Sequence, residues 1–150
     1  MLNSNVPAIL REQGAIAIPI DAYRLGSDVP MFHSIFWGYG QRNLRAAHQV
    51  RRMKNVYAVW CSNYACGPDS FTLHFYNYIM EGKPYAVIET DGHSGDAGTR
   101  TRIEAFLHCV REHIDKGGEL GKPNEFLSIE EKNVSLLRAG REGKTIIIPR

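Results

Sequence analysis

The sequence lacks the features of membrane-spanning, secreted and nucleic-acid-binding proteins. No apolar run approaches the roughly 18–20 residues that a membrane span needs. The first residues have neither the charged nor the apolar region of a signal peptide. A charge excess of one sign is also missing, because 18 Lys and Arg face 16 Asp and Glu. We therefore expect a soluble protein whose partners include neither a nucleic acid nor a membrane.

Cysteine is scarce, and its three occurrences argue against a disulfide framework. Cys61, Cys66 and Cys109 are odd in number and stand among apolar residues, which favours reduced thiols and a cytoplasmic location. The spacing between Cys61 and Cys66 does not fit the strong zinc patterns, and a second cysteine pair is absent. A complete four-ligand metal site cannot be built from these cysteines alone.

What the chain does contain is an alternation of amphipathic and β-type segments. Helical periodicity and capping residues predict helices near 3–14, 41–54, 71–80 and 101–116. Apolar, β-branched and aromatic runs predict strands at 15–20, 56–62, 84–90 and 145–149. This order favours an α/β domain with a Rossmann-like three-layer arrangement and a mostly parallel sheet of about four strands.

We place this α/β domain at residues 1–116. Residues 117–150 read as a linker or irregular arm followed by a strand, and we expect that strand to lead to a further domain absent from this chain. In parallel sheets, ligands bind outside the carboxyl ends of the strands. The predicted strands 56–62 and 84–90 belong to successive strand-loop-helix units, so the loops after them are expected to share one edge and face one cleft.

The loop after the first of these strands contains Cys66 in a turn that leads into a helix. The N–H groups and dipole of a helix N-terminus favour a thiolate, which suits a nucleophile or a metal ligand. Asn63 and Gly67 flank this candidate site. The alternative is that Cys66 is a small, half-buried apolar residue in a tight turn.

The second loop brings oxygen and imidazole groups together at Asp91, His93 and Asp96, with Arg102 and Glu104 just beyond. Such a cluster could hold a divalent metal or support acid–base catalysis. A self-capping loop, in which Arg102 pairs with Glu104 or Asp91, is the alternative. We interpret the aromatic-rich stretch at 32–39 as packing, although a structural assembly domain could use it for dimerisation.

Two motifs carry a resemblance to a known family: Ser62-Asn-Tyr-Ala-Cys-Gly-Pro-Asp-Ser-Phe71, and Asp91-Gly-His-Ser-Gly-Asp-Ala-Gly98 with Thr101-Arg-Ile-Glu-Ala-Phe106. The chain resembles the acyl-CoA dehydratase activase-related proteins of anaerobes, relatives of the 2-hydroxyglutaryl-CoA dehydratase and benzoyl-CoA reductase systems. The likeness runs over most of the chain, which looks like a piece of the dehydratase-like portion.

The resemblance implies an iron–sulfur-linked redox module that serves ATP-driven electron transfer to a dehydratase or reductase. Cys66 matches a cluster-ligating position, and the cluster, for which 4Fe–4S is the candidate type, would belong to the parent protein and not to this fragment alone. The implied partners are other domains of the parent chain, an ATP-binding activator module and acyl-CoA dehydratase components. An enzyme centred on the loop from Asp91 to Asp96 is the alternative function.

Overall fold

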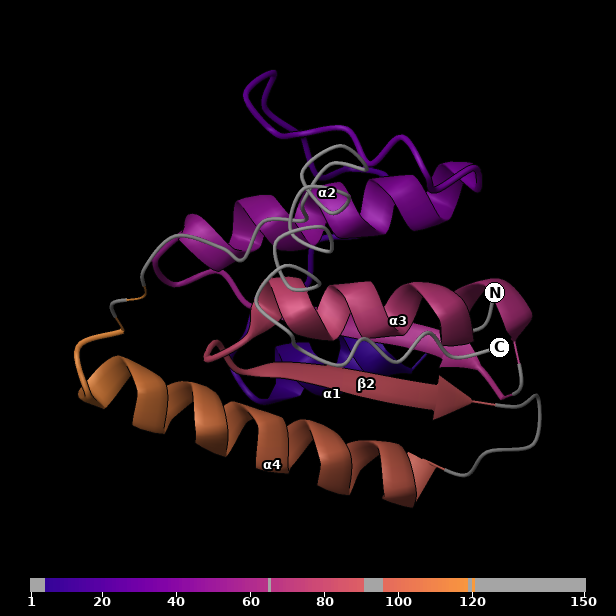
Figure 1. Cartoon of the computed structure of the whole chain (residues 1–150). Helices are drawn as coiled ribbons and strands as arrows, with labels where there is room; N and C mark the ends of the chain where they lie inside the picture. Colours follow the sequence, from indigo (N-terminus) through magenta and orange to yellow (C-terminus); the bar gives the residue numbers. More distant parts are fainter. Residues whose placement is uncertain (1–4, 65, 91–95, 119, 121–150) are drawn as a thin grey trace, which may run out of the picture.

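The computed structural model describes residues 5–64, 66–90, 96–118 and 120, and these residues form a mixed α/β structure. This part of the chain contains four helices and two strands, and Figure 1 shows how the helices are arranged around the strands. The elements in chain order are α1 (Val6–Glu12), α2 (Gly38–Arg52), β1 (Ala58–Asn63), α3 (Gly67–Met80), β2 (Tyr85–Thr90) and α4 (Asp96–Asp115). The α/β class predicted from the sequence is therefore confirmed.

The two strands are parallel neighbours. Their register runs from Ala58 opposite Tyr85 to Asn63 opposite Thr90, and their parallel direction confirms the one expected from successive strand-loop-helix units. Side chains alternate between the two faces of each strand. Trp60 and Val87 pack toward one core cluster, whereas Val59 and Ile88 pack toward the other. Both faces of the sheet are consequently buried.

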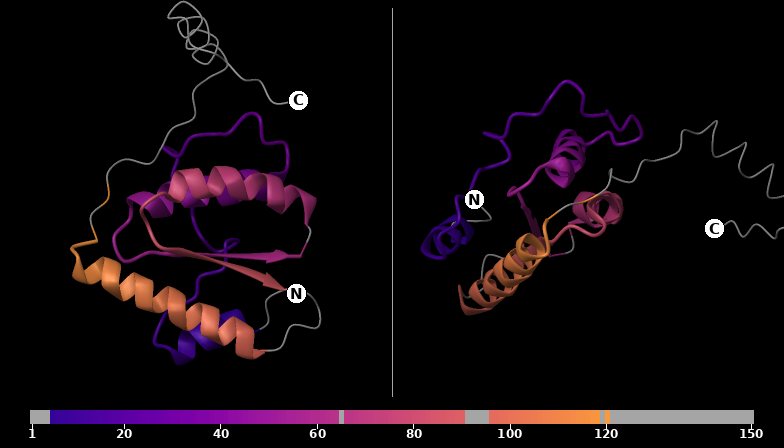
Figure 2. Two further views of the ribbon diagram at one scale, coloured as in Figure 1. Left: turned by 60° about the horizontal axis from the view of Figure 1, so that its bottom comes forward. Right: turned by 90° about the vertical axis from the view of Figure 1, so that its left-hand side faces the viewer.

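Helices cover each face of the sheet, which gives three layers. Figure 2 shows α1 and α4 on one side of the strands and α2 and α3 on the other. Ile9 of α1 and Ile103 of α4 meet Ile88 in the first core cluster. Leu44 of α2 and Ile79 of α3 meet Trp60 in the second. The sheet thus lies between two apolar layers.

The strand expected at 15–20 is absent, so the described sheet has two strands in place of about four. Ala15 and Ala17 do pack against the first core cluster. However, within the described residues no backbone hydrogen bond joins positions 16–18 to β1 or β2. Pro19 has no N–H to donate, and the chain turns at residue 20. The strand expected at 145–149 and the linker at 117–150 lie almost entirely outside the described residues.

Three helices begin earlier than their periodicity predicts, at Gly38, Gly67 and Asp96. Pro68 suits the first turn of α3, because its missing N–H would have no helical partner there. The N-cap residue of α3 is Cys66. Among the described residues, no helix is long and apolar enough to cross a membrane.

The long loop before α2 is held by polar side chains of that helix. Arg42 donates from Nε and Nη2 to the carbonyl of Ile20, at 3.1 and 2.9 Å. Gln41 accepts from the N–H of Phe32 at 2.9 Å and donates to its carbonyl at 2.7 Å. Farther along α2, the side chain of Gln49 accepts from the N–H of Gly26 at 2.8 Å. These contacts fix the loop backbone although the loop has no regular secondary structure.

Candidate functional site

The carboxyl edge of the sheet gathers the ends of both strands and the beginnings of the helices. β1 ends at Asn63 and β2 at Thr90, and these two residues are paired. In Figure 1 the strand arrows point toward the end of the molecule at which α2, α3 and α4 begin. The turn that carries Cys66 leaves β1 at this edge, where parallel sheets place their ligands.

Cys66 occupies the N-cap position of α3. Its N–H donates to the carbonyl of Asn63 at 3.1 Å, and its own carbonyl accepts from the N–H of Ser70 at 2.9 Å. The side chain makes no capping hydrogen bond, and the residue is half-buried. An added Cβ on the next residue, Gly67, would meet nothing within 4 Å. The half-buried thiol therefore stands beside the first turn of a helix.

A polar bridge that the sequence did not reveal supports this turn. Ser62 is buried and its Oγ donates to Asp69 Oδ2 at 2.6 Å. Thr90 Oγ1 lies 3.5 Å from the carbonyl of Ser62, so the bridge also reaches β2. Ser62 and Asp69 both stand inside the motif that carries the family resemblance. Their separation of seven residues gives no local signal of contact, because the turn has to fold before they meet.

Only some residues of the second predicted loop belong to the part of the chain that the structure describes. Asp91 and His93 lie outside the described residues, and Asp96 is the first residue of α4. Arg102 and Glu104 are exposed on α4. A neighbouring arginine, Arg100, forms an ion pair with Glu12 of α1 at 2.9 Å.

The other two cysteines do not join Cys66. Cys61 lies in β1 and packs against the cluster beneath α1 and α4, whereas Cys109 is exposed in the middle of α4. The described part of the chain holds no group of three or more His, Cys, Asp or Glu residues that could bind a metal ion. Cys66 can therefore supply one ligand to a metal centre, and the remaining ligands would have to come from elsewhere.

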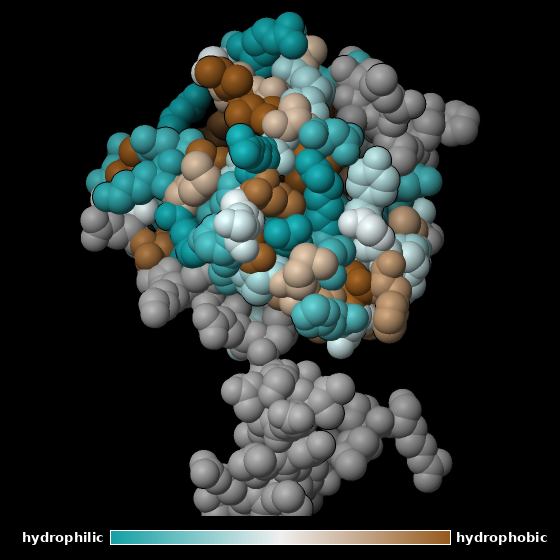
Figure 3. Space-filling model, turned by 90° about the horizontal axis from the view of Figure 1, so that it is seen from above, coloured by the Kyte–Doolittle hydropathy of each residue, from teal (hydrophilic) through white to brown (hydrophobic). Residues whose placement is uncertain are grey.

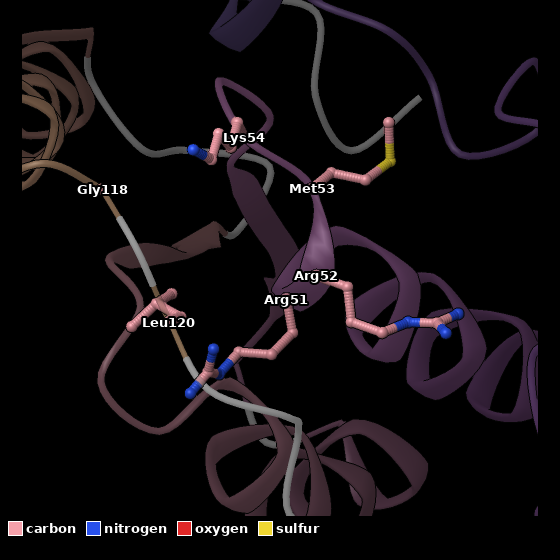
Figure 4. A pocket seen from close by; sticks show the side chains of 6 residues that line it. All are labelled: Arg51, Arg52, Met53, Lys54, Gly118 and Leu120. Atoms are coloured by element: carbon pink, nitrogen blue, oxygen red, sulfur yellow. The ribbon is translucent and has the colours of Figure 1, made fainter.

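A pocket of about 210 Å³ lies at the C-terminal end of α2, close to the end of α4. Figure 4 shows the residues that line it: Arg51, Arg52, Met53, Lys54, Gly118 and Leu120. The three cationic side chains run in different directions in this view. Arg52 is paired with Asp28 at 3.0 Å. The pocket does not present converging donors to an anion.

Near this pocket, Lys83 is buried and joins α2 to the sheet. Its ammonium group donates to the carbonyl of Val50 at 2.6 Å and to that of Met53, both at the end of α2. It lies 4.9 Å from the centre of the Tyr57 ring. Burial, and then the charge of Arg51, lower the pKa of Lys83 to about 8. This cation fills the role of a helix cap, because it binds carbonyls at the C-terminal end of α2; that of Val50 also accepts from the N–H of Met53 at 3.0 Å.

Comparisons with known proteins identify no relative. No family model matches the chain, and no curated protein and no solved structure matches it either.

Proposed function

We propose that this chain is an iron–sulfur-linked redox module of an acyl-CoA dehydratase activase-like protein, with Cys66 as a cluster ligand. One observation carries the proposal: Cys66 lies at the N-terminus of α3, at the carboxyl edge of a parallel pair of strands, and its side chain is not used in capping. The family resemblance supports the same residue at the same turn.

The chemistry of the turn suits a thiolate ligand. Iron–sulfur clusters are held by deprotonated cysteines. The partial positive charge of a helix N-terminus stabilises an anion beside it. The open space next to Gly67 leaves room for a bulky group near the backbone. The hydrogen bond from Ser62 to Asp69 ties the turn to β1, so the ligand would be held in a fixed position.

The remaining ligands and the energy source would come from outside the described residues. Within these residues no group of three or more His, Cys, Asp or Glu forms a metal site, so Cys66 would supply one thiolate to a cluster completed by other segments of the parent protein. When bound, the cluster would relay electrons. The proposed partners are an ATP-binding activator module, which drives the transfer, and a dehydratase or reductase component, which accepts the electrons.

Anaerobic reconstitution with iron and sulfide tests this function. The protein should be produced from its gene with any flanking sequence, as wild type, Cys66→Ser and Cys109→Ser. We expect Cys66→Ser to lose most of the bound iron and sulfide. Cys109→Ser should retain them, because Cys109 is exposed in the middle of α4. Equal cluster content in the wild type and Cys66→Ser would show that Cys66 is not a ligand.

A further inference from the structure

Hydrophobic side chains reach the surface between hydrophilic ones on the side of α2 (Figure 3). Just before and within the first turn of this helix, Phe36 is 90% exposed and Tyr39 66%, so the packing interpretation of stretch 32–39 is wrong for these two residues. Within the described residues nothing indicates what would cover the two rings. By contrast, a group of titratable side chains at the amino-terminal edge of the sheet makes well-defined contacts.

These titratable side chains stand beside the pocket of about 210 Å³, which has two walls. Residues 51–54, at the end of α2, form one wall, whereas Gly118 and Leu120, which follow α4, form the other. α2 and α4 lie on opposite faces of the sheet (Figure 2), so the two walls belong to different layers. Side chains from the residues that precede β1 and β2 hold both walls.

Lys83 and Tyr57 tie the walls together. On the side of α2, Lys83 binds the carbonyls of Val50 and Met53, and its ammonium group lies 4.9 Å from the centre of the Tyr57 ring. On the side of α4, the hydroxyl oxygen of Tyr57 lies 2.9 Å from His113 Nδ1, and the two rings meet edge to face. Burial raises the pKa of Tyr57, so its hydroxyl keeps its proton and can donate to a neutral imidazole.

The chain changes direction directly after this contact, at two glycines with positive φ. Gly117 has a φ of 98° and Gly118 a φ of 60°, a conformation that glycine adopts without strain. The N–H of Gly118 donates to the carbonyl of His113 at 2.9 Å. A Cβ at Gly118 would lie 3.8 Å from the His113 ring. The position of His113 therefore sets the path of the second wall of the pocket.

The surroundings of His113 disfavour a positive charge on its ring. The charged and titratable groups around it are Arg51 of α2, Tyr57 and Lys83 at the edge of the sheet, and Glu112, Asp115 and Lys116 of α4 itself. Glu112 is paired with Lys116 at 3.0 Å. The C-terminal end of α4 favours a cation, but burial, and then the charges of Lys83 and Arg51, lower the pKa of His113.

We propose that His113, Tyr57 and Lys83 form an acid-sensitive latch, which holds the chain after α4 near the end of α2 and loosens when His113 gains a proton. A protonated imidazole can still donate to the Tyr57 hydroxyl oxygen, so repulsion from Lys83 drives the change. Lys83 is 4% exposed and bound to two carbonyls, so it cannot retreat. The end of α4 lies at the surface and is followed by Gly117 and Gly118, so it is the part that moves.

Acid should favour the loosened state. In that state the His113 ring leaves the two cations and its pKa returns toward the ordinary value of 6.5, whereas the pKa is lower in the closed state. The closed state therefore binds fewer protons, and opening becomes more favourable as the pH falls below about 6.5. Lys83, with a pKa of about 8, keeps its charge throughout this range. The latch goes beyond the proposed redox function and does not depend on Cys66.

Amide hydrogen exchange of Gly118, followed by NMR at about pH 7 and about pH 5, tests the latch directly. Protection factors, which correct for the intrinsic effect of pH on exchange, should fall at least about threefold at Gly118 on acidification. Gly14 is the matched control, because it also has a positive φ after a helix and its N–H donates to the carbonyl of Arg11 at 3.0 Å. Protection at Gly14 should stay constant.

Two variants assign the effect to His113 and Lys83. His113→Asn keeps an oxygen that can accept from the Tyr57 hydroxyl but cannot gain a proton in this pH range, so the fall at Gly118 should disappear. Lys83→Met removes one of the two cations and should make the fall smaller. An undiminished fall in either variant would overturn the proposal, as would constant protection of Gly118 or an equal fall at Gly14 in the wild type.

Discussion

Lys83 shows how one buried charge can organise a helix end. It is 4% exposed, and its ammonium group replaces the water that would otherwise bind the last carbonyls of α2. Its charge also lies over the ring of Tyr57, whose hydroxyl oxygen is 2.9 Å from His113 Nδ1 at the end of α4. Burial first, and then the charges of Lys83 and Arg51, lower the pKa of His113. Lys83 therefore connects the end of α2, through Tyr57, with the end of α4 in the opposite layer.

Replacing Lys83 with Met should lower the free energy of unfolding in urea by about 2 kcal/mol, because two buried carbonyls lose a charged donor. Lys116→Met is the matched control. Lys116 is exposed and pairs with Glu112 one turn away, so its loss should change stability by less than about 0.5 kcal/mol. In Lys83→Met the pKa of His113, followed by NMR titration, should rise because a nearby cation is gone. An unchanged His113 pKa would contradict the proximity of the two groups.

The same lysine should make stability depend on pH. The pKa of Lys83 is about 8 in the folded protein, against an ordinary value of 10.5. Between these values the folded state binds fewer protons than the unfolded chain, so the free energy of unfolding rises with pH across that window. Urea titrations at several pH values should show this rise in the wild type and lose it in Lys83→Met. The same pH dependence in the wild type and in Lys83→Met would contradict the lowered pKa.

At the scale of elements, α2 and α3 approach closely at Gly40. A Cβ at this position would lie 3.2 Å from Thr72 Oγ1 and 3.4 Å from Ile35 Cγ2. Gly40 is buried near the start of α2, and Thr72 is almost fully buried in α3. Because Gly40 has no side chain, α2 and α3 can pack closely near the ends at which both helices begin.

Gly40→Leu should therefore destabilise the protein by about 1–3 kcal/mol, because the side chain has no room between the helices. Gly98→Leu is the matched control in α4, where an added Cβ meets nothing within 4 Å. Leucine is a better helix former than glycine, so Gly98→Leu should leave the midpoint of urea denaturation unchanged or raise it. Equal losses in both variants would mean that the contact at Gly40 does not limit packing.

For the whole molecule, the narrow sheet leaves an apolar segment at the surface. In the extended stretch 15–18, Ala15 and Ala17 face the core, whereas Ile16 is 91% exposed and Ile18 58%. The described residues offer no backbone partner to 16–18. An unpaired, extended and aliphatic segment of this kind is a template for pairing between chains.

We expect the double variant Ile16→Lys, Ile18→Lys to show less light scattering than the wild type on heating or concentration. Its free energy of unfolding should stay within about 0.5 kcal/mol of the wild type, because both side chains are exposed. Ala17→Lys is the contrasting variant. It places a charge against the core cluster and should destabilise by more than about 1 kcal/mol. Unchanged scattering in the double variant would show that this segment does not drive association.

The sequence alone determined the features that depend on neighbouring residues. Apolar, β-branched and aromatic runs predicted β1 and β2, helical spacing predicted the apolar faces of the helices, and the order of elements predicted parallel strands with Cys66 in the turn after β1. These predictions hold because periodicity decides which face of a segment is buried. The tertiary structure decided what depends on distant residues.

Stretch 15–20 has a strand-like pattern but is not a strand, because pairing needs hydrogen bonds from another segment. Phe36 is as apolar as a core residue, and only the contacts that fix its backbone place it in solvent. Lys83 caps a helix that ends about 30 residues earlier, and Ser62 meets Asp69 only across a folded turn. Long-range contacts of this kind leave no local pattern in the chain, so only the tertiary structure could reveal them.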